Sequence, residues 1–200
     1  MLYALGGSGV ILLAIVLIVI ATAGGGGGSS MNVAAAQKAM AAAGCTFKSV
    51  KGDSAGHHVT SLNAKIKYNT FPPSSGTHYY IPAVWDFYTD PANPIQVVHN
   101  EEHGGVIIWW GEKVPQSTIA QLRRFYDEQP VSVLGTPIKG LGSKIALTAW
   151  TKGKDGIHGR VATCSKFDQK AFATFRDTFR GHGPENVPGG INPSQNQPGT

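Results

Sequence analysis

Apolar positions along this chain recur with two periods, one typical of helices and one typical of strands. Helical spacing and capping residues predict helices in residues 32–44, 117–129 and 166–181. Short alternating or continuous apolar runs predict strands in residues 45–51, 63–70, 106–110, 131–134, 144–150 and 156–164. Because the helices and strands do not alternate regularly, we expect one α+β domain in which helices pack on a mostly antiparallel sheet.

The first part of the chain has a different pattern. Asp, Glu, Lys and Arg are absent from Met1 to Gln37, and Val10–Ala23 is almost continuously apolar. Together with the residues before it, this segment is long enough to cross a bilayer as a helix, so we expect residues 1–23 to be a transmembrane anchor. A cleaved signal segment is the alternative, since Ala21 and Ala23 have the spacing of a cleavage site. In both cases the main domain lies outside the cytoplasm, and the anchored form is a single-pass protein of the cell membrane.

Composition sets the boundaries of the domain. Residues 24–30, GGGGGSS, have the composition of a flexible linker. Residues 31–182 hold the apolar periodicity and form the predicted extracytoplasmic domain. The last residues, 183–200, are rich in Gly and Pro, and we expect them to be disordered.

Charge and cysteine content narrow the function classes. The formal net charge is +5, but the basic residues are scattered and form no recognition helix, so no nucleic-acid partner is expected. The chain has 2 cysteines, Cys45 and Cys164, near the two ends of the globular part. In an exported chain two such cysteines form a disulfide by default.

A long irregular segment, residues 71–94, is rich in Pro, Gly and Tyr. A connection of this length in a compact domain is usually functional or disordered, and its aromatic residues favour an ordered loop that packs on the domain. Tyr79, Tyr80 and Trp85 are the candidates for contact with a ligand or with another membrane protein. An interaction module built on this loop is therefore one candidate function.

The stretch HNEEHGG, His99–Gly105, holds the candidate chemistry. If residues 96–103 form a short helix, His99, Glu102 and His103 share one face because they are spaced i, i+3 and i+4. Two imidazoles and a carboxylate can bind a transition metal from such a face, and His78 in the preceding loop can add a ligand. This donor set suits Zn²⁺, Cu²⁺ or Ni²⁺ better than Mg²⁺ or Ca²⁺.

Two other interpretations of HNEEHGG stay open. The order His-x-x-Glu-His is that of an inverted zinc-peptidase helix, in which Glu102 would be the general base. No second motif supports a zinc-dependent hydrolase, so catalysis is not expected and no catalytic residue is assigned. In the other interpretation the histidines bind no metal, and their hydrogen bonds hold the loop closed.

Several stretches, taken together and in order, resemble a bacterial family of membrane-anchored extracytoplasmic proteins, the domain-of-unknown-function family 3105. They are GC at 44–45, HV at 58–59, YNTFPPSSGTHY at 68–79, VVHNEEHGGVII at 97–108, IALTAW at 145–150 and FRGHGPE at 179–185. The resemblance implies one extracytoplasmic domain with a disulfide between Cys45 and Cys164. It puts five residues on motif positions: His58, His78, His99, Glu102 and His103. The family has a hydrophobic residue where Glu101 stands, which implies that Glu101 is dispensable.

The residues and the resemblance together predict a membrane-tethered domain that binds a transition metal, with Zn²⁺ or Cu²⁺ as the candidates. His78, His99 and His103 are the expected ligands, and Glu102 or His58 completes or orients the site. The alternative is a non-metal interaction module that uses loop 71–94.

Overall fold

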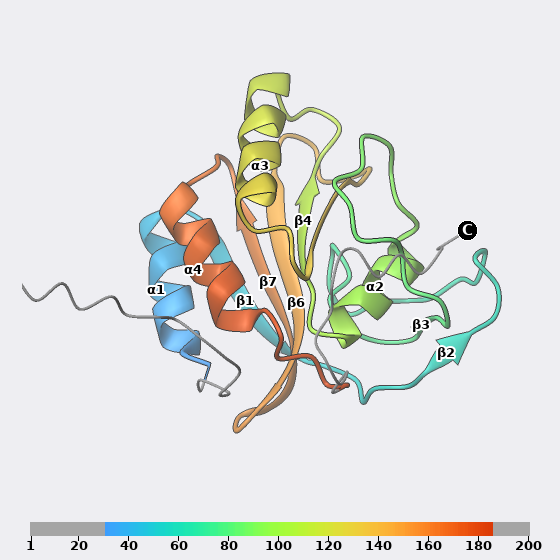
Figure 1. Ribbon diagram of the computed structural model, residues 1–200. Coiled ribbons are helices and arrows are strands. Elements are labelled where there is room, and N and C mark those ends of the chain that lie inside the picture. The colour runs from blue at the N-terminus through green and yellow to red at the C-terminus, as the bar shows by residue number, and fades with distance from the viewer. Residues whose placement is uncertain (1–30, 186–200) are drawn as a thin grey trace, which may run out of the picture.

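The computed structural model describes residues 31–185, in which a five-stranded sheet is covered on both faces (Figure 1). Its strands are β1 (Thr46–Lys51), β4 (Val106–Trp110), β5 (Val133–Pro137), β6 (Ile145–Gly153) and β7 (Gly156–Cys164), in the order β1-β7-β6-β4-β5. Neighbouring strands run antiparallel except β4 and β5, which run parallel. The α+β class is confirmed, and the sheet is a mixed one.

Helices lie on both sides of this sheet. The first face is covered by α1 (Val33–Ala42), α3 (Gln116–Glu128) and α4 (Gln169–Phe179) (Figure 1). The second face is covered by α2 (Pro94–Glu102) and by irregular segments that precede it. The helices predicted from periodicity are all present. The predicted cap of α1 is confirmed, because the Asn32 side chain accepts a hydrogen bond from the N–H of Ala35.

The core is divided between the two faces. Along β4, Val106, Ile108 and Trp110 pack toward the first face, while Ile107 and Trp109 pack toward α2. Since a central strand is buried on both faces, it is apolar at every position. The predicted stripe of phenylalanines on α4 is fully buried on the first face: Phe172, Phe175 and Phe179.

The two cysteines form the predicted disulfide. Cys45, just after α1, is bonded to Cys164 at the end of β7, across a sequence separation of 119 residues. Closing so long a loop restricts the unfolded chain and stabilises the fold by about 4–5 kcal/mol in the chain-entropy model.

One strand prediction is wrong and another is displaced. Residues 63–70 alternate between exposed and half-buried side chains but pair with no strand. The segment reaches the edge strand β1 only through the Asn69 side chain, which donates to the carbonyl of Lys51 at 3.0 Å. Alternating apolar and polar residues indicate that one side of a segment faces the protein and the other faces solvent, and this can hold for an irregular segment as well as for a strand. The strand predicted at 131–134 begins at Val133, since a turn at Pro130 precedes it.

The predicted anchor at 1–23, the linker at 24–30 and residues 186–200 of the predicted tail lie outside the described residues. Within residues 31–185, none of the helices combines the length and the apolar character that a membrane span requires. Residues 183–185 of the predicted tail pack against α2, where the N–H of Glu185 donates to the carbonyl of Glu102 at 3.2 Å.

Candidate metal centre

The helix predicted within HNEEHGG is present as α2, and its ends follow from local sequence. Asn93 caps the start with its side chain, and Pro94 occupies the first turn, where no N–H partner is needed. The helix ends at Glu102, and His103 is its C-cap residue. Gly104 follows with φ 85°, a left-handed conformation that favours glycine.

A buried asparagine holds the Pro-rich loop on this helix. Every residue of α2 from Ile95 to Glu102 is buried. The Asn100 side chain accepts from the N–H of Ala83 at 3.0 Å and donates to the carbonyl of Ala83 at 2.9 Å. These two bonds satisfy the amide and fix the loop, so the prediction of an ordered loop is confirmed.

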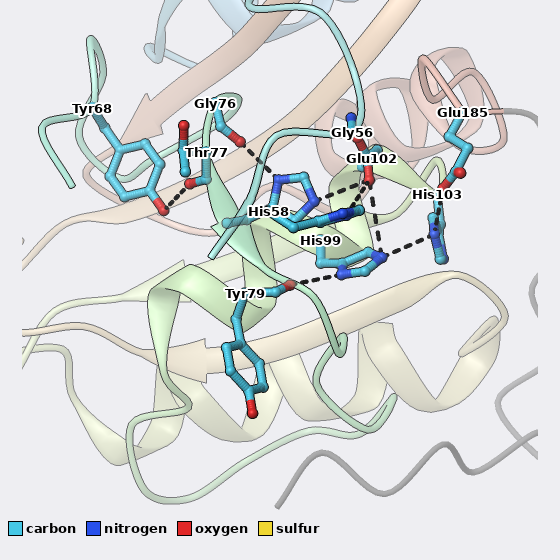
Figure 2. Close-up of polar contacts among 11 residues, drawn as sticks. Gly56, His58, Tyr68, Gly76, Thr77, Tyr79, His99, Glu102, His103 and Glu185 are labelled. Atoms are coloured by element: carbon cyan, nitrogen blue, oxygen red, sulfur yellow. Dashed lines mark hydrogen bonds and ion pairs between the residues drawn. The ribbon is translucent and has the colours of Figure 1, made fainter. Parts of the chain in front are cut away.

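A very short parallel strand pair brings two more histidines to α2. Strands β2 (His58–Val59) and β3 (His78–Tyr79) pair in a register that places His58 opposite His78. The N–H of His78 donates to the carbonyl of His57 at 3.0 Å. Because β3 also lies against α2, both rings reach the side chain of His99 (Figure 2).

Glu102 lies at the centre of the resulting cluster. Its Oε2 atom is 3.0 Å from Nε2 of His78, 3.6 Å from Nε2 of His58 and 3.9 Å from Nε2 of His99 (Figure 2). The four ligand atoms lie within 4.8 Å of one another. A tetrahedral ion with ligands at about 2.0–2.2 Å holds them about 3.3–3.6 Å apart. The distances from Oε2 of Glu102 to the three ring nitrogens lie on either side of this separation, so small side-chain shifts would complete a coordination shell.

Backbone carbonyls orient two of the rings. Nδ1 of His78 is 2.7 Å from the carbonyl oxygen of Gly76, and Nδ1 of His99 is 2.8 Å from that of Tyr79. Because a carbonyl oxygen can only accept, each Nδ1 carries a proton, and in the neutral ring Nε2 then carries a lone pair. This second contact is typical of histidines that bind a metal through the other nitrogen.

That tautomer leaves two buried acceptors facing each other. His78 and Glu102 are fully buried, and within the described residues Nε2 of His78 and Oε2 of Glu102 have no polar partner other than each other and the neighbouring rings. A buried polar atom without a partner costs about 1–3 kcal/mol. At 3.0 Å the two atoms also repel unless a proton or a cation lies between them. A metal ion would satisfy both atoms and the other two rings together.

The protonation states of Glu102 and His99 also suit metal binding. Burial by itself raises the pKa of Glu102, but contacts with His78 and with the N–H of Gly56 outweigh it and lower the pKa to about 2. Burial lowers the pKa of His99 to about 4, although its hydrogen bond to Tyr79 opposes the shift. Near neutral pH the carboxylate is ionised and the His99 ring is neutral, which are the forms that bind metals.

A second group of ligand atoms shares two of these residues. It consists of His99, Glu102, His103 and Glu185. Nε2 of His103 lies 3.1 Å from Nε2 of His99 and 2.7 Å from Oε2 of Glu185 (Figure 2). His103 is therefore close to His99, as its spacing predicts, but no group in residues 31–185 contains both His103 and His78.

A known protein family covers the part of the chain that holds both ligand groups. The sequence profile described as "Protein of unknown function (DUF3105)" matches residues 58–190, more than half of the chain. The chain belongs to the DUF3105 family. The matched region begins at His58, so it includes every residue of both ligand groups, whereas α1 and β1 precede it. Among curated proteins and among solved structures, none matches this chain significantly.

Two glutamates of this DUF3105 domain, Glu185 and Glu101, have positions that the sequence does not predict. Glu185 is not among the predicted ligands, and the one signal that could have indicated it is its place in FRGHGPE, a stretch that carries the family resemblance. Glu101 is fully buried, and burial raises its pKa well above the ordinary value. A hydrophobic residue would fit such a position.

The aromatic candidates of loop 71–94 lie beside the cluster. Tyr79 contributes its carbonyl oxygen to His99, and its ring lies 4.7 Å from the ring of Tyr80, which is 49% exposed. Trp85 packs against the apolar residues between α2 and β4, so its position is explained by packing. Their part in binding a ligand or partner stays a prediction. The other three histidines, His57, His158 and His182, belong to neither ligand group.

Proposed function

We propose that this DUF3105 domain binds one transition-metal ion, Zn²⁺ or Cu²⁺, through His58, His78, His99 and Glu102. The observation that carries the proposal is the buried approach of Nε2 of His78 to Oε2 of Glu102, at 3.0 Å, with ligand atoms of His58 and His99 in the same group within 4.8 Å. Carbonyl groups fix the rings of His78 and His99 so that their lone pairs point to the same carboxylate.

The donor set supports the choice of metal. Three imidazole nitrogens and one carboxylate oxygen suit Zn²⁺ or Cu²⁺, whereas Mg²⁺ and Ca²⁺ prefer oxygen ligands alone. Thiolate ligation is excluded for the described residues, because both cysteines of the chain are in the disulfide. Zn²⁺ takes four such ligands in a tetrahedron, and the group offers four ligand atoms.

Glu102 is better suited to be a ligand than to be the base of a hydrolase. A general base works best with a pKa near the operating pH, and the pKa of Glu102 is lowered to about 2. One oxygen of Glu102 also accepts from the N–H of Gly56, while the other faces the rings. We therefore propose a binding site rather than a hydrolytic one.

The disulfide supports work in an oxidising compartment outside the cytoplasm, where such bonds persist. Attachment to a membrane is proposed from the apolar stretch Val10–Ala23 of the sequence alone.

Two neighbouring glutamates give a matched test. The full chain, Glu102→Gln and Glu101→Gln would each be incubated with Zn²⁺ or Cu²⁺, freed of loose metal and measured by elemental mass spectrometry. About one equivalent in the wild type and in Glu101→Gln, with little in Glu102→Gln, supports the site. Equal metal in all three proteins, or none in the wild type, would contradict it.

A further inference from the structure

The segment after α4 folds back against the end of α2 and holds Glu185 there. The N–H of Gly181 donates to the carbonyl of Gly104 at 2.8 Å, and the N–H of Glu185 donates to that of Glu102 at 3.2 Å. The two glycines approach so closely that a Cβ on Gly104 would lie 2.9 Å from Cα of Gly181. Main-chain contacts, rather than a flexible side chain, thus set the position of Glu185.

From the buried pair His78 and Glu102, exposure increases in two directions, toward His58 and toward His103 and Glu185. The side chains of His78 and Glu102 are 0% exposed. His103 is 20% exposed, and Glu185, whose carboxylate is 2.7 Å from the His103 ring, is 49% exposed. His99 lies between these layers, with its Nε2 atom 3.1 Å from that of His103. An ion arriving from solvent can therefore meet a carboxylate and an imidazole before it reaches the buried ligands.

The two groups cannot each hold an ion at the same time. His99 belongs to both, and because its Nδ1 is bonded to the carbonyl of Tyr79, only Nε2 is left, whose single lone pair binds one ion. Both also use Glu102. The groups are therefore two positions for one ion, an inner one and an outer one.

We propose that His99, Glu102, His103 and Glu185 form an outer position for a divalent cation, through which the ion of the inner site enters and leaves. This inference rests on the proposed function. The ion binds first between Glu185 and His103, together with His99 and Glu102. It then moves inward as His58 and His78 replace Glu185 and His103.

The exchange balances without a redox step. Two metal–ligand bonds break and two form, while the bonds to His99 and Glu102 persist, so the ion never has to regain its whole hydration shell. Afterwards Glu185 and His103 return to the contact that they make with each other. The half-exposed ring of His58 is the other route from solvent, but it lacks the negative charge that draws a cation toward Glu185.

The test is the rate at which Co²⁺, a spectroscopic substitute for Zn²⁺, binds to the full chain in a stopped-flow absorbance measurement. Glu185→Gln and His103→Ala should slow both association and dissociation of Co²⁺ by about tenfold. Since the inner ligands are unchanged, the equilibrium affinity should stay within about threefold of the wild type. Glu128→Gln is the matched control, because it removes the same charge at the end of α3, where Glu128 contacts Gln169.

Three results would overturn the outer position. Unchanged rates in Glu185→Gln would show that the ion enters elsewhere. Equal slowing in Glu128→Gln would reduce the effect to net charge. Weaker affinity with an unchanged association rate would make Glu185 a ligand of the final site. If the wild type binds no Co²⁺, the proposed function itself fails, and the outer position with it.

Discussion

The two faces of the sheet are built from different kinds of side chain. Under α1, α3 and α4 a large apolar cluster fills the core beside the disulfide, and two buried arginines, Arg160 and Arg176, lie over its phenylalanine rings. Under α2 a smaller apolar cluster gives way to a buried polar layer that includes His78, Asn100 and Glu102. Burying polar groups costs free energy unless each finds a partner. The comparison suggests that the first face supplies stability, which lets the second face hold unsatisfied ligand atoms.

The largest expected effect concerns the first face. Phe175→Ala should lower the free energy of unfolding by about 3–5 kcal/mol, because the ring is fully buried between Phe47 and Phe179. Metal stoichiometry should not change under conditions where the variant stays folded. Urea unfolding and elemental analysis measure the two quantities. A folded variant that no longer binds metal would contradict the claim that the first face supplies stability alone.

The second effect concerns His99 on the other face, which should make the stability of the metal-free protein depend on pH. Folding lowers the pKa of His99 from 6.5 to about 4, so the unfolded state binds more protons between these values. Stability should therefore fall as the pH falls from 6.5 to 4, by up to about 3 kcal/mol. His99→Gln should remove this part of the slope in urea unfolding with a chelator present. An identical slope in the variant would contradict the assignment.

The third effect separates a cluster histidine from one outside it. His78→Ala should weaken Zn²⁺ binding by at least about 100-fold, because it removes a fully buried ligand. His57→Ala is the control, since that ring contacts Ser54 and belongs to neither ligand group. Competition with a chromophoric chelator gives both affinities. Equal losses in the two variants would place the site elsewhere.

The smallest expected effect concerns Glu101, a buried glutamate that belongs to neither ligand group. Above pH 4.5 the Glu101 carboxyl ionises in the unfolded chain, whereas burial keeps it protonated in the folded one, so stability is lost as the pH rises. Glu101→Met should therefore raise stability at pH 8 by at least about 1 kcal/mol, with less gain near pH 4.5. Thermal unfolding at both pH values measures this, and a loss of stability at pH 8 would refute it.

The two faces also differ in how far the sequence predicts them. The phenylalanine stripe of α4 and the run VIIWW predict their places in the core, because periodicity reports which side of an element is buried. The same reasoning predicts that His99, Glu102 and His103 share one face of α2. These features depend on residues close together in the chain.

The rest of the site depends on contacts between distant segments. The pairing of His58 with His78 rests on two residues of parallel strand, too short a stretch for a periodic signal. Glu185 reaches His103 only because Gly181 and Gly104 allow two backbones to approach. In residues 63–70 the local pattern is misleading, since it alternates as in a strand but the segment pairs with no other strand. Tertiary contacts decide such features, and local pattern does not contain them.

The most direct test of the central claim is X-ray absorption at the zinc edge of the full chain loaded with about one equivalent of Zn²⁺. We expect four ligands at about 2.0–2.1 Å, with the multiple scattering of three imidazole rings and one oxygen. The substitution His78→Ala should remove one ring from this signal, and His57→Ala should remove none. A shell of oxygen ligands without imidazole scattering, or one unchanged by loss of His78, would contradict a metal centre built on Glu102 and these histidines.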